Sequence, residues 1–277
     1  MKEKLFYMLL GLYRALFARP SFYLFNKALF DLSIRGMGLQ NYENDRISGE
    51  SFFLENILGR CDRPLVLDVG ANRGHYAEKI AQCSAGAVLY AFEPHPATFR
   101  ALQQVAVRYG FEALNCGMGA EVGTLQLYDR KPAGDGTEHA SLYREVIEDI
   151  HKVPATAVEV GVSTIDTFVA ERGLERITLL KIDTEGHEYQ VLLGAQHTLA
   201  RGMVDMVQIE FNEMNVISRV FFRDFYTLLS GSYDMFRLLP GGLLPLTKYR
   251  PLHCELFAFQ NLLFVRRDRD ICLPGGN

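Results

Sequence analysis

The sequence predicts an α/β protein built on a doubly wound parallel sheet, preceded by a helical N-terminal extension. From residue 64 onward, short aliphatic runs alternate with helical stretches, which is the pattern of such a sheet. The first of these runs ends in a glycine-rich turn. The chain has 277 residues, of which 48% are apolar and 22% charged. It can therefore bury a large core and is neither disordered nor of low complexity.

The predicted elements begin with two units of a strand followed by a helix. Residues 65–70 form a buried strand that ends in glycine, and residues 76–83 form the helix after it. Residues 87–92 form the second strand, and residues 97–109 form the next helix. Further strands are predicted at residues 111–116, 124–128, 177–183, 204–211, 235–239 and 255–265, and further helices at residues 188–199 and 221–229.

The stretch from residue 129 to residue 154 differs from a simple connection. It is long and polar, with two glycines and a proline close together. We interpret it as a lid or substrate-binding loop with one helical piece over residues 142–150. His139 and Ser141 lie in this loop and are candidate substrate-binding residues.

Charge and cysteine content exclude some classes of partner. The net charge is −4 and the pI is about 6.0, whereas a protein that binds nucleic acid through phosphates usually carries a basic excess. No nucleic-acid partner is therefore expected. The five cysteines are odd in number and widely spaced, with no Cys-x-x-Cys pair, which indicates a reduced, intracellular protein. The sequence gives no indication of the oligomeric state.

The chain divides into three segments by composition. Residues 1–60 form the N-terminal helical extension, residues 61–267 the main domain and residues 268–277 a C-terminal tail. The first 38 residues contain six basic and two acidic side chains, a local excess of positive charge in an acidic protein.

An apolar run over residues 5–17 is predicted to form a helix that is too short to span a bilayer. Arg14 interrupts the run, which argues against a signal peptide. The simpler interpretation is a helix packed on the main domain. The alternative is a basic, aromatic-rich helix lying on an anionic membrane surface. We expect a cytoplasmic protein, with peripheral contact at the inner face of the membrane under the second interpretation.

The first chemical signal is a glycine-rich turn between a strand and a helix, in which Asp68, Gly70, Asn72 and Gly74 alternate with other residues. Glycines let the backbone approach a ligand closely, and the start of the helix points free N–H groups at it. Glu93 follows the next strand, 25 residues after Asp68, where a doubly wound fold places the acid that binds the ribose hydroxyls. Together these features indicate an adenosine-containing ligand.

A nicotinamide cofactor fits the same turn less well. A dinucleotide fingerprint requires glycine where this chain has Asn72 and His75, so NAD is the weaker alternative. Glu93 would repel the 2′-phosphate of NADP.

Three runs in order along the chain carry a family resemblance. They are VLDVGANRG at residues 66–74, AFEP at residues 91–94 and LKIDTEGHE at residues 180–188. The sequence resembles the FkbM family of S-adenosylmethionine-dependent O-methyltransferases, and the third run is the most specific part of the match. The resemblance implies a class I, Rossmann-like methyltransferase sheet, mostly parallel with an antiparallel C-terminal strand. It also implies methylation of hydroxyls on glycans or polyketide-like natural products.

By the same resemblance, Asp68, Gly70 and Gly74 hold the methionine end of S-adenosylmethionine, and Glu93 holds its ribose. Many class I enzymes grip the adenine amine with an acid after the third strand, but the sequence CGMG at residues 116–119 offers none. The full set of cofactor-binding candidates is Asp68, Gly70, Asn72, Gly74, Glu93 and Met118.

The second signal is a group of polar residues at strand ends. Asp183 ends one strand, while Glu210 and Asn212 end its neighbour, so all three should lie at the ligand-binding edge of the sheet. Asp183, Glu185 and Glu210 are the catalytic candidates, because a carboxylate can take the proton from an attacking hydroxyl. Glu188 is better explained as an acid at the start of a helix.

The strand-end group could also hold a cation. Asp183, Glu210 and Asn212 offer the hard oxygen ligands that suit Mg²⁺, so they are candidate magnesium ligands under a minority hypothesis. We favour Asp183 as a base or as a substrate anchor. His139 and His187 are weaker candidates for the base.

The acceptor is expected to be an oxygen atom of a sugar. The sequence lacks the Asn/Asp-Pro-Pro-aromatic run of amino-methylating DNA enzymes and the Pro-Cys nucleophile of pyrimidine-methylating ones. Arginines and tyrosines between residues 219 and 250 suit sugar rings or phosphates, although a solvated charged surface explains them equally well. The substrate-binding candidates are Asn212, His139, Ser141 and Arg219.

The expected function is therefore transfer of a methyl group from S-adenosylmethionine to a sugar hydroxyl in a glycan or glycan precursor. Two alternatives stay open. One is a non-catalytic, cofactor-binding scaffold of a glycan assembly complex, and the other is an NAD-dependent sugar oxidoreductase.

Overall fold

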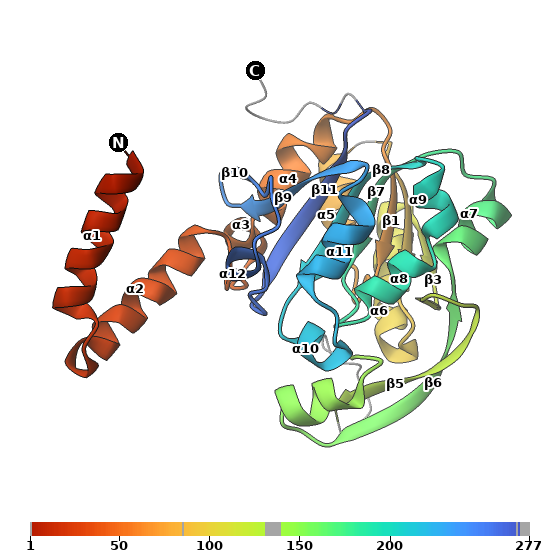
Figure 1. Cartoon of the computed structure of the whole chain (residues 1–277). Coiled ribbons are helices and arrows are strands. Elements are labelled where there is room, and N and C mark those ends of the chain that lie inside the picture. The colour runs from red at the N-terminus through yellow and green to blue at the C-terminus, as the bar shows by residue number, and fades with distance from the viewer. Residues whose placement is uncertain (1, 85, 131–139, 270, 272–277) are drawn as a thin grey trace.

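Two parts of the chain pack differently. The computed structural model describes residues 2–84, 86–130, 140–269 and 271. An α/β domain holds the sheets, while the helices α1 (Lys2–Phe17) and α2 (Tyr23–Gly36) stand to one side of it (Figure 1). The 3-10 turn η1 (Pro20–Phe22) joins these two helices.

The main sheet confirms the predicted fold class. Its strands lie side by side in the order β10 (Gly242–Pro245), β9 (Tyr233–Leu239), β11 (Gln260–Arg266), β8 (Val204–Phe211), β7 (Ile177–Ile182), β1 (Leu65–Val69), β2 (Val88–Phe92) and β3 (Glu112–Leu114). The strands from β8 to β3 are parallel, and β11 is antiparallel to both neighbours. The sheet is thus mostly parallel with an antiparallel C-terminal strand.

Helices cover both faces of this sheet (Figure 1). One face carries α4 (Glu50–Asn56), α5 (His75–Cys83) and α6 (Pro96–Tyr109), and the other carries α7 (Ile165–Arg172), α8 (Glu188–Leu193), α9 (Gln196–Ala200) and α11 (Phe222–Leu229). Successive residues of a strand enter opposite cores, as Val66 and Leu67 of β1 do. The short elements are α3 (Asp45–Ser48), η2 (Leu58–Arg60), α10 (Met214–Ser218) and α12 (Pro251–Cys254).

A second, three-stranded sheet flanks the expected loop over residues 129–154. Its strands are β4 (Gly117–Met118), β6 (Ala155–Ser163) and β5 (Gly123–Arg130), in that spatial order. A π-helical turn, η3 (Val146–Ile150), occupies part of the predicted helical piece. Strand β6 is missing from our sequence prediction, although the alternation of Val158, Val160 and Val162 is a strand signal.

The helix predicted over residues 188–199 is in fact two helices, α8 and α9. The carboxylate of Asp166 on α7 accepts hydrogen bonds from the backbone N–H groups of His197 at 3.0 Å and Thr198 at 2.8 Å. The backbone N–H of Asp166 in turn donates to the carbonyl of Gly194 at 2.9 Å. A side chain from a neighbouring helix thus caps a new helix start, which no local pattern reveals.

The strand predicted over residues 255–265 begins only at Gln260. Glu255 lies outside the sheet because its carboxylate accepts hydrogen bonds from the backbone N–H groups of Phe222 and Arg223, at 2.9 and 3.0 Å. This acid stabilises the start of α11, which has unsatisfied N–H groups.

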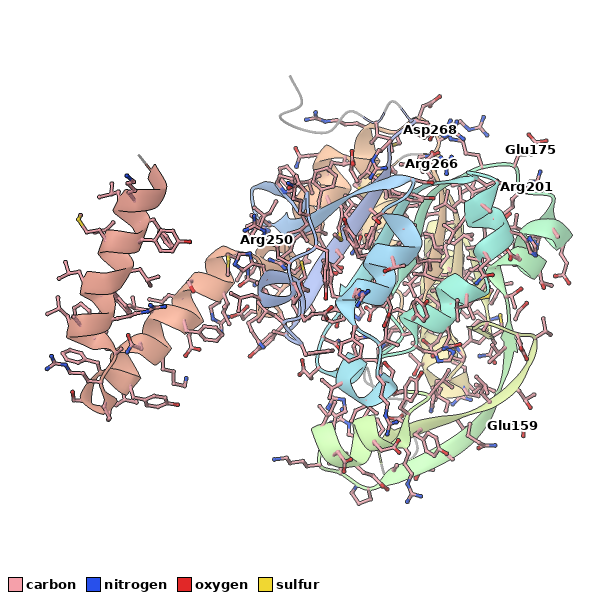
Figure 2. The ribbon with its side chains drawn as sticks, viewed as in Figure 1. Glu159, Glu175, Arg201, Arg250, Arg266 and Asp268 are labelled. Atoms are coloured by element: carbon pink, nitrogen blue, oxygen red, sulfur yellow. The ribbon has the colours of Figure 1, made fainter. Side chains whose placement is uncertain are left out.

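The change from exposed helices to the packed domain does not occur at residue 60, where we predicted the end of the N-terminal extension. Phe53 and Leu54 of α4 are almost fully buried in the core of the main domain, and Leu39 is also buried. The part that stands apart consists of α1 and α2, in which no described side chain is buried. Figure 2 shows the side chains of these two helices projecting on several sides, apart from the densely packed domain. The simpler interpretation of the N-terminal helix, as a helix packed on the main domain, is therefore wrong.

Candidate functional site

A cavity of about 840 Å³ lies at the carboxyl edge of the parallel strands, where open α/β sheets bind ligands. Each of the four central strands contributes a predicted site residue to its lining. Gly70 follows β1, Glu93 follows β2, Asp183 follows β7 and Glu210 lies near the end of β8. The structure therefore brings these four residues together as the sequence predicts.

The glycine turn permits a very close approach of two strand ends. Gly70 has a φ of +80°, and a Cβ atom at this position would lie 1.8 Å from the carbonyl oxygen of Asp183. The backbone N–H of Asp183 donates to the carbonyl of Val69 at 3.0 Å. Only glycine fits here, because any side chain would push Asp183 away from the cavity wall. Gly74, with a φ of +87°, begins α5.

Glu93 is buried at the edge of the cavity, with its carboxylate held by two backbone donors. Its Oε2 accepts the N–H of Asn72 at 3.0 Å, and its Oε1 accepts the N–H of His95 at 2.7 Å. Burial raises the pKa of Glu93 to about 7, although these two hydrogen bonds act in the opposite direction. Each oxygen keeps a second lone pair for a donor in the cavity. This geometry suits a vicinal pair of ribose hydroxyls.

Asp68 lies beneath the cavity and not in its lining. Its side chain is fully buried, and its Oδ1 is 3.5 Å from Nζ of Lys181. The structure therefore does not place Asp68 where it would contact a cofactor bound in the cavity directly. Asp68 instead supports Lys181, which lines the cavity.

Asn72 and Met118 both line the cavity. The backbone N–H of Asn72 holds Glu93, and its side-chain Oδ1 accepts the N–H of Arg73 at 2.7 Å. Met118 is 2% exposed and gives the cavity an apolar wall beside Gly117. An apolar wall of this kind can accept the flat face of an aromatic base.

The three catalytic candidates all line the cavity. Oδ2 of Asp183 accepts a hydrogen bond from Lys181 at 3.1 Å. Burial raises the pKa of Glu210 well above its usual value, and the charges of Asp183 and Glu185 raise it further. Glu210 thus holds a proton more readily than an exposed glutamate does, because like charges in one acidic cluster cannot all ionise.

Asn212 and Ser141 have structural partners that account for their side chains. The amide of Asn212 donates to Oε1 of Glu210 at 2.6 Å and accepts the N–H of Met214 at 2.9 Å. Asn212 still lines the cavity. Ser141 is fully buried, and its hydroxyl donates to the carbonyl of Glu185 at 2.8 Å. Ser141 therefore positions the turn that carries Glu185 and is not exposed to a substrate.

Glu188 has a structural role, in line with its interpretation from the sequence as an acid at the start of a helix. Its Oε1 accepts hydrogen bonds from the backbone N–H groups of Thr184 at 2.9 Å and Gly186 at 3.0 Å. Burial raises the pKa of Glu188 to about 7, while these donors lower it. The carboxylate holds the turn between β7 and α8, which shapes one side of the cavity.

The histidine and arginine candidates differ in position. His187 lines the cavity, and burial lowers its pKa to about 4, so the ring is neutral near pH 7. Its Nδ1 lies 3.4 Å from the hydroxyl of Tyr143. Arg219 is exposed at the end of α10 and does not line the cavity, so its assignment to the substrate is not supported. His139 lies outside the described residues.

The residues that form one wall of the cavity are not among those predicted from the sequence. Gln40, Tyr42 and Asn44, which follow α2, line the cavity together with Phe259 from the other end of the chain. The backbone N–H of Gln40 donates to the carbonyl of Phe259 at 2.8 Å. The N-terminal segment thus contributes to the site itself.

The magnesium hypothesis gains no support from these groups. Within the described part of the chain, no three His, Cys, Asp or Glu residues are arranged to hold a metal ion. Lys181 supplies the positive charge beside Asp183.

Comparisons with known proteins identify the family of this chain. The model of the family described as "Methyltransferase FkbM domain" matches residues 68–231. The 31-O-demethyl-FK506 methyltransferase FkbM of Streptomyces tacrolimicus is 31% identical over 182 residues, covering 54% of this chain and 70% of that protein. The hexuronic acid methyltransferase AglP of Haloferax volcanii is 30% identical over 158 residues, covering 55% of this chain and 59% of that protein.

Among solved structures, a SAM-dependent methyltransferase from Agrobacterium tumefaciens aligns with a TM-score of 0.41 and 12% identity. The alignment covers 80% of this chain and 62% of that one.

Proposed function

Because this chain belongs to the FkbM family of methyltransferases, we propose that it transfers a methyl group from S-adenosylmethionine to a sugar hydroxyl in a glycan or glycan precursor. One observation carries the proposal. Asp183, Glu185 and Glu210 line the same cavity as the buried carboxylate of Glu93. A proton acceptor for the substrate and a ribose-binding group for the cofactor thus share one space.

The residues of the cavity fit S-adenosylmethionine. Glu93 offers two oxygens to a ribose, Met118 offers an apolar wall to adenine, and the turn at Gly70 lets the backbone approach closely. A volume of about 840 Å³ is within the range of small-molecule sites and leaves room for part of an acceptor. When bound, the cofactor supplies an electrophilic methyl group.

The acidic cluster fits the need of an alcohol acceptor. A sugar hydroxyl has a pKa far above neutral, so its proton must leave as its oxygen attacks. We assign proton removal to the carboxylate of Asp183, whose position Lys181 fixes by a 3.1 Å hydrogen bond. The carboxyl group of Glu210 and the amide of Asn212 are available to hydrogen-bond other hydroxyls of the sugar.

The names of two relatives support an oxygen acceptor and a sugar. The relative from Streptomyces is named for a 31-O-demethyl substrate, and the relative from Haloferax for hexuronic acid. The match spans only 59% of the Haloferax protein, so we propose a sugar acceptor for this chain and do not transfer it from that name.

The direct test is transfer of labelled methyl from S-adenosylmethionine to a panel of nucleotide sugars and glycan fractions. We expect label in a sugar hydroxyl with the full chain, and at least a hundredfold less with Asp183→Asn. Label on nitrogen, or label in a polyketide but in no sugar, would contradict the assigned acceptor. Cofactor binding without any transfer would favour a non-catalytic scaffold.

A further inference from the structure

The hairpin formed by α1, η1 and α2 exposes an unusual amount of apolar surface. Soluble proteins rarely leave large contiguous apolar patches open to water, and such patches mark interaction sites. The large apolar side chains that are more than half exposed on this hairpin are Leu5, Phe6, Tyr7, Met8, Leu9, Leu12, Tyr23, Leu24, Phe30 and Leu32. The hairpin therefore needs a partner.

The apolar side chains of α1 are exposed all around the helix. Phe6, Tyr7, Met8 and Leu9 follow one another through a full turn, and each is between 53% and 68% exposed. A contact with one protein surface, including a second copy of this hairpin, covers one stripe of a helix. A lipid layer can surround the helix on all sides.

The charge on the hairpin favours an anionic partner. Over residues 4–36, five side chains are basic, namely Lys4, Arg14, Arg19, Lys27 and Arg35, and Asp31 is the single acid. Asp31 is already paired with Lys27 at 2.8 Å. Two such positively charged hairpins would repel each other, whereas anionic lipid headgroups attract them.

We propose that this hairpin docks on the surface of an anionic lipid bilayer, with its apolar side chains inserted among the headgroups and its basic side chains on the phosphates. It docks without crossing, because no helix in the described ranges is both long and apolar enough to span a membrane. Its binding does not depend on the methyl-transfer proposal.

Hydrogen bonds connect the end of α2 to the segment that lines the cavity. The side-chain amide of Asn41 donates to the carbonyl of Arg35 at 3.0 Å, and Arg237 of β9 donates to the carbonyl of Met37 at 3.0 Å. Gln40 and Tyr42, a few residues after α2, line the cavity. A docked hairpin would therefore fix the position of the cavity wall relative to the bilayer.

Sedimentation with vesicles tests this proposal on the full chain. The vesicles contain phosphatidylcholine with or without phosphatidylglycerol. We expect binding to the anionic vesicles at low salt, weaker binding to neutral ones, and weakening by added salt. Replacing Arg14 and Arg19 by glutamine should weaken binding roughly thirtyfold, at roughly fivefold for each basic residue.

A matched pair of triple variants isolates the apolar contribution. Met8→Gln, Leu24→Gln and Leu32→Gln together should weaken vesicle binding at least roughly tenfold. Val107, Val122 and Leu252 lie outside the hairpin and are at least 66% exposed. Their replacement by glutamine should change binding by less than about twofold.

Two outcomes would overturn the proposal. One is a wild-type chain that stays in the supernatant with anionic vesicles at low salt. The other is a concentration-dependent dimer that the hairpin variants dissociate without any effect on vesicle binding, which would assign the surface to a second copy. Thermal unfolding of each variant checks that the domain stays folded.

Discussion

Nζ of Lys181, in β7, lies 3.1 Å from Oδ2 of Asp183, which directly follows the same strand. The same ammonium lies 3.5 Å from Oδ1 of the fully buried Asp68. Burial alone would lower the pKa of Lys181, but the carboxylates of Asp183, Asp68 and Glu50 together raise it above its usual value. The lysine therefore stays charged and ties the proposed base to the core.

Strand register explains why these groups meet. Asp68, Lys181 and Gln208 are direct neighbours across β1, β7 and β8, so their side chains lie on one face of the sheet. The hydroxyl of Tyr76 donates to Gln208, whose amide donates to Glu50 at 3.1 Å. The floor of the site is thus a continuous polar layer inside the core.

Lys181→Met should destabilise the fold by about 3–5 kcal/mol, because it leaves the buried carboxylate of Asp68 without its counter-charge. Denaturant unfolding at neutral pH measures this loss. The double variant Asp68→Asn, Lys181→Met should recover a large part of the stability, since it removes the unpaired charge. Equal stability of the single variant and the wild type would show that the ion pair does not matter.

Gly70→Ala should abolish cofactor binding and turnover, because the new Cβ would lie 1.8 Å from the carbonyl oxygen of Asp183. Gly110→Ala is the matched control. Gly110 has a similar φ of +77° but nothing within 4 Å of the new Cβ, so its replacement should cost only about 1 kcal/mol of stability. Similar behaviour of the two variants would mean that backbone conformation, and not the close approach, sets the requirement for glycine.

Affinity for S-adenosylhomocysteine should rise with pH through about pH 7, because the pKa of Glu93 is raised to about 7 by burial. Below that pH the carboxyl is protonated and accepts fewer hydroxyl donors. A roughly tenfold gain between about pH 6 and about pH 8 is expected from the ionised fraction alone. Glu93→Gln should bind weakly and show no such gain; a gain that persists in this variant would assign the pH dependence to another group.

Asp183→Asn should leave affinity for S-adenosylhomocysteine nearly unchanged while reducing turnover by roughly 10²–10⁴, the contribution of a positioned proton acceptor. Single-turnover rates with labelled cofactor separate these two effects. Turnover close to wild type would remove Asp183 from the mechanism. Loss of wild-type activity in EDTA, restored by Mg²⁺, would instead revive the metal hypothesis.

Local sequence signals were enough to predict the parallel strands and several residues that line the cavity at their ends. The glycine at position 70 and the acid at position 93 each follow a strand, and the sheet itself brings strand ends together. Asp183 and Glu210 were predicted for the same reason.

Features that depend on distant contacts could not be predicted in this way. A hydrogen bond to Phe259 holds Gln40 at the cavity, and no local sequence pattern near either residue predicts this contact. Ser141 was assigned to the substrate because it lies in a polar stretch, but a partner 44 positions away buries its hydroxyl. Arg219 does not line the cavity, because the residue type alone does not determine where the end of α10 lies.

The proposed function depends most directly on which ligand Glu93 binds, and calorimetric titration of the full chain with S-adenosylhomocysteine and with NAD measures this. We expect S-adenosylhomocysteine to bind, NAD to bind weakly or not at all, and Glu93→Ala to weaken the first by roughly tenfold to a hundredfold, the loss of about 1.5–3 kcal/mol of charged hydrogen bonding. Tighter binding of NAD than of S-adenosylhomocysteine, or an unchanged affinity for S-adenosylhomocysteine in the variant, would contradict the proposed cofactor site.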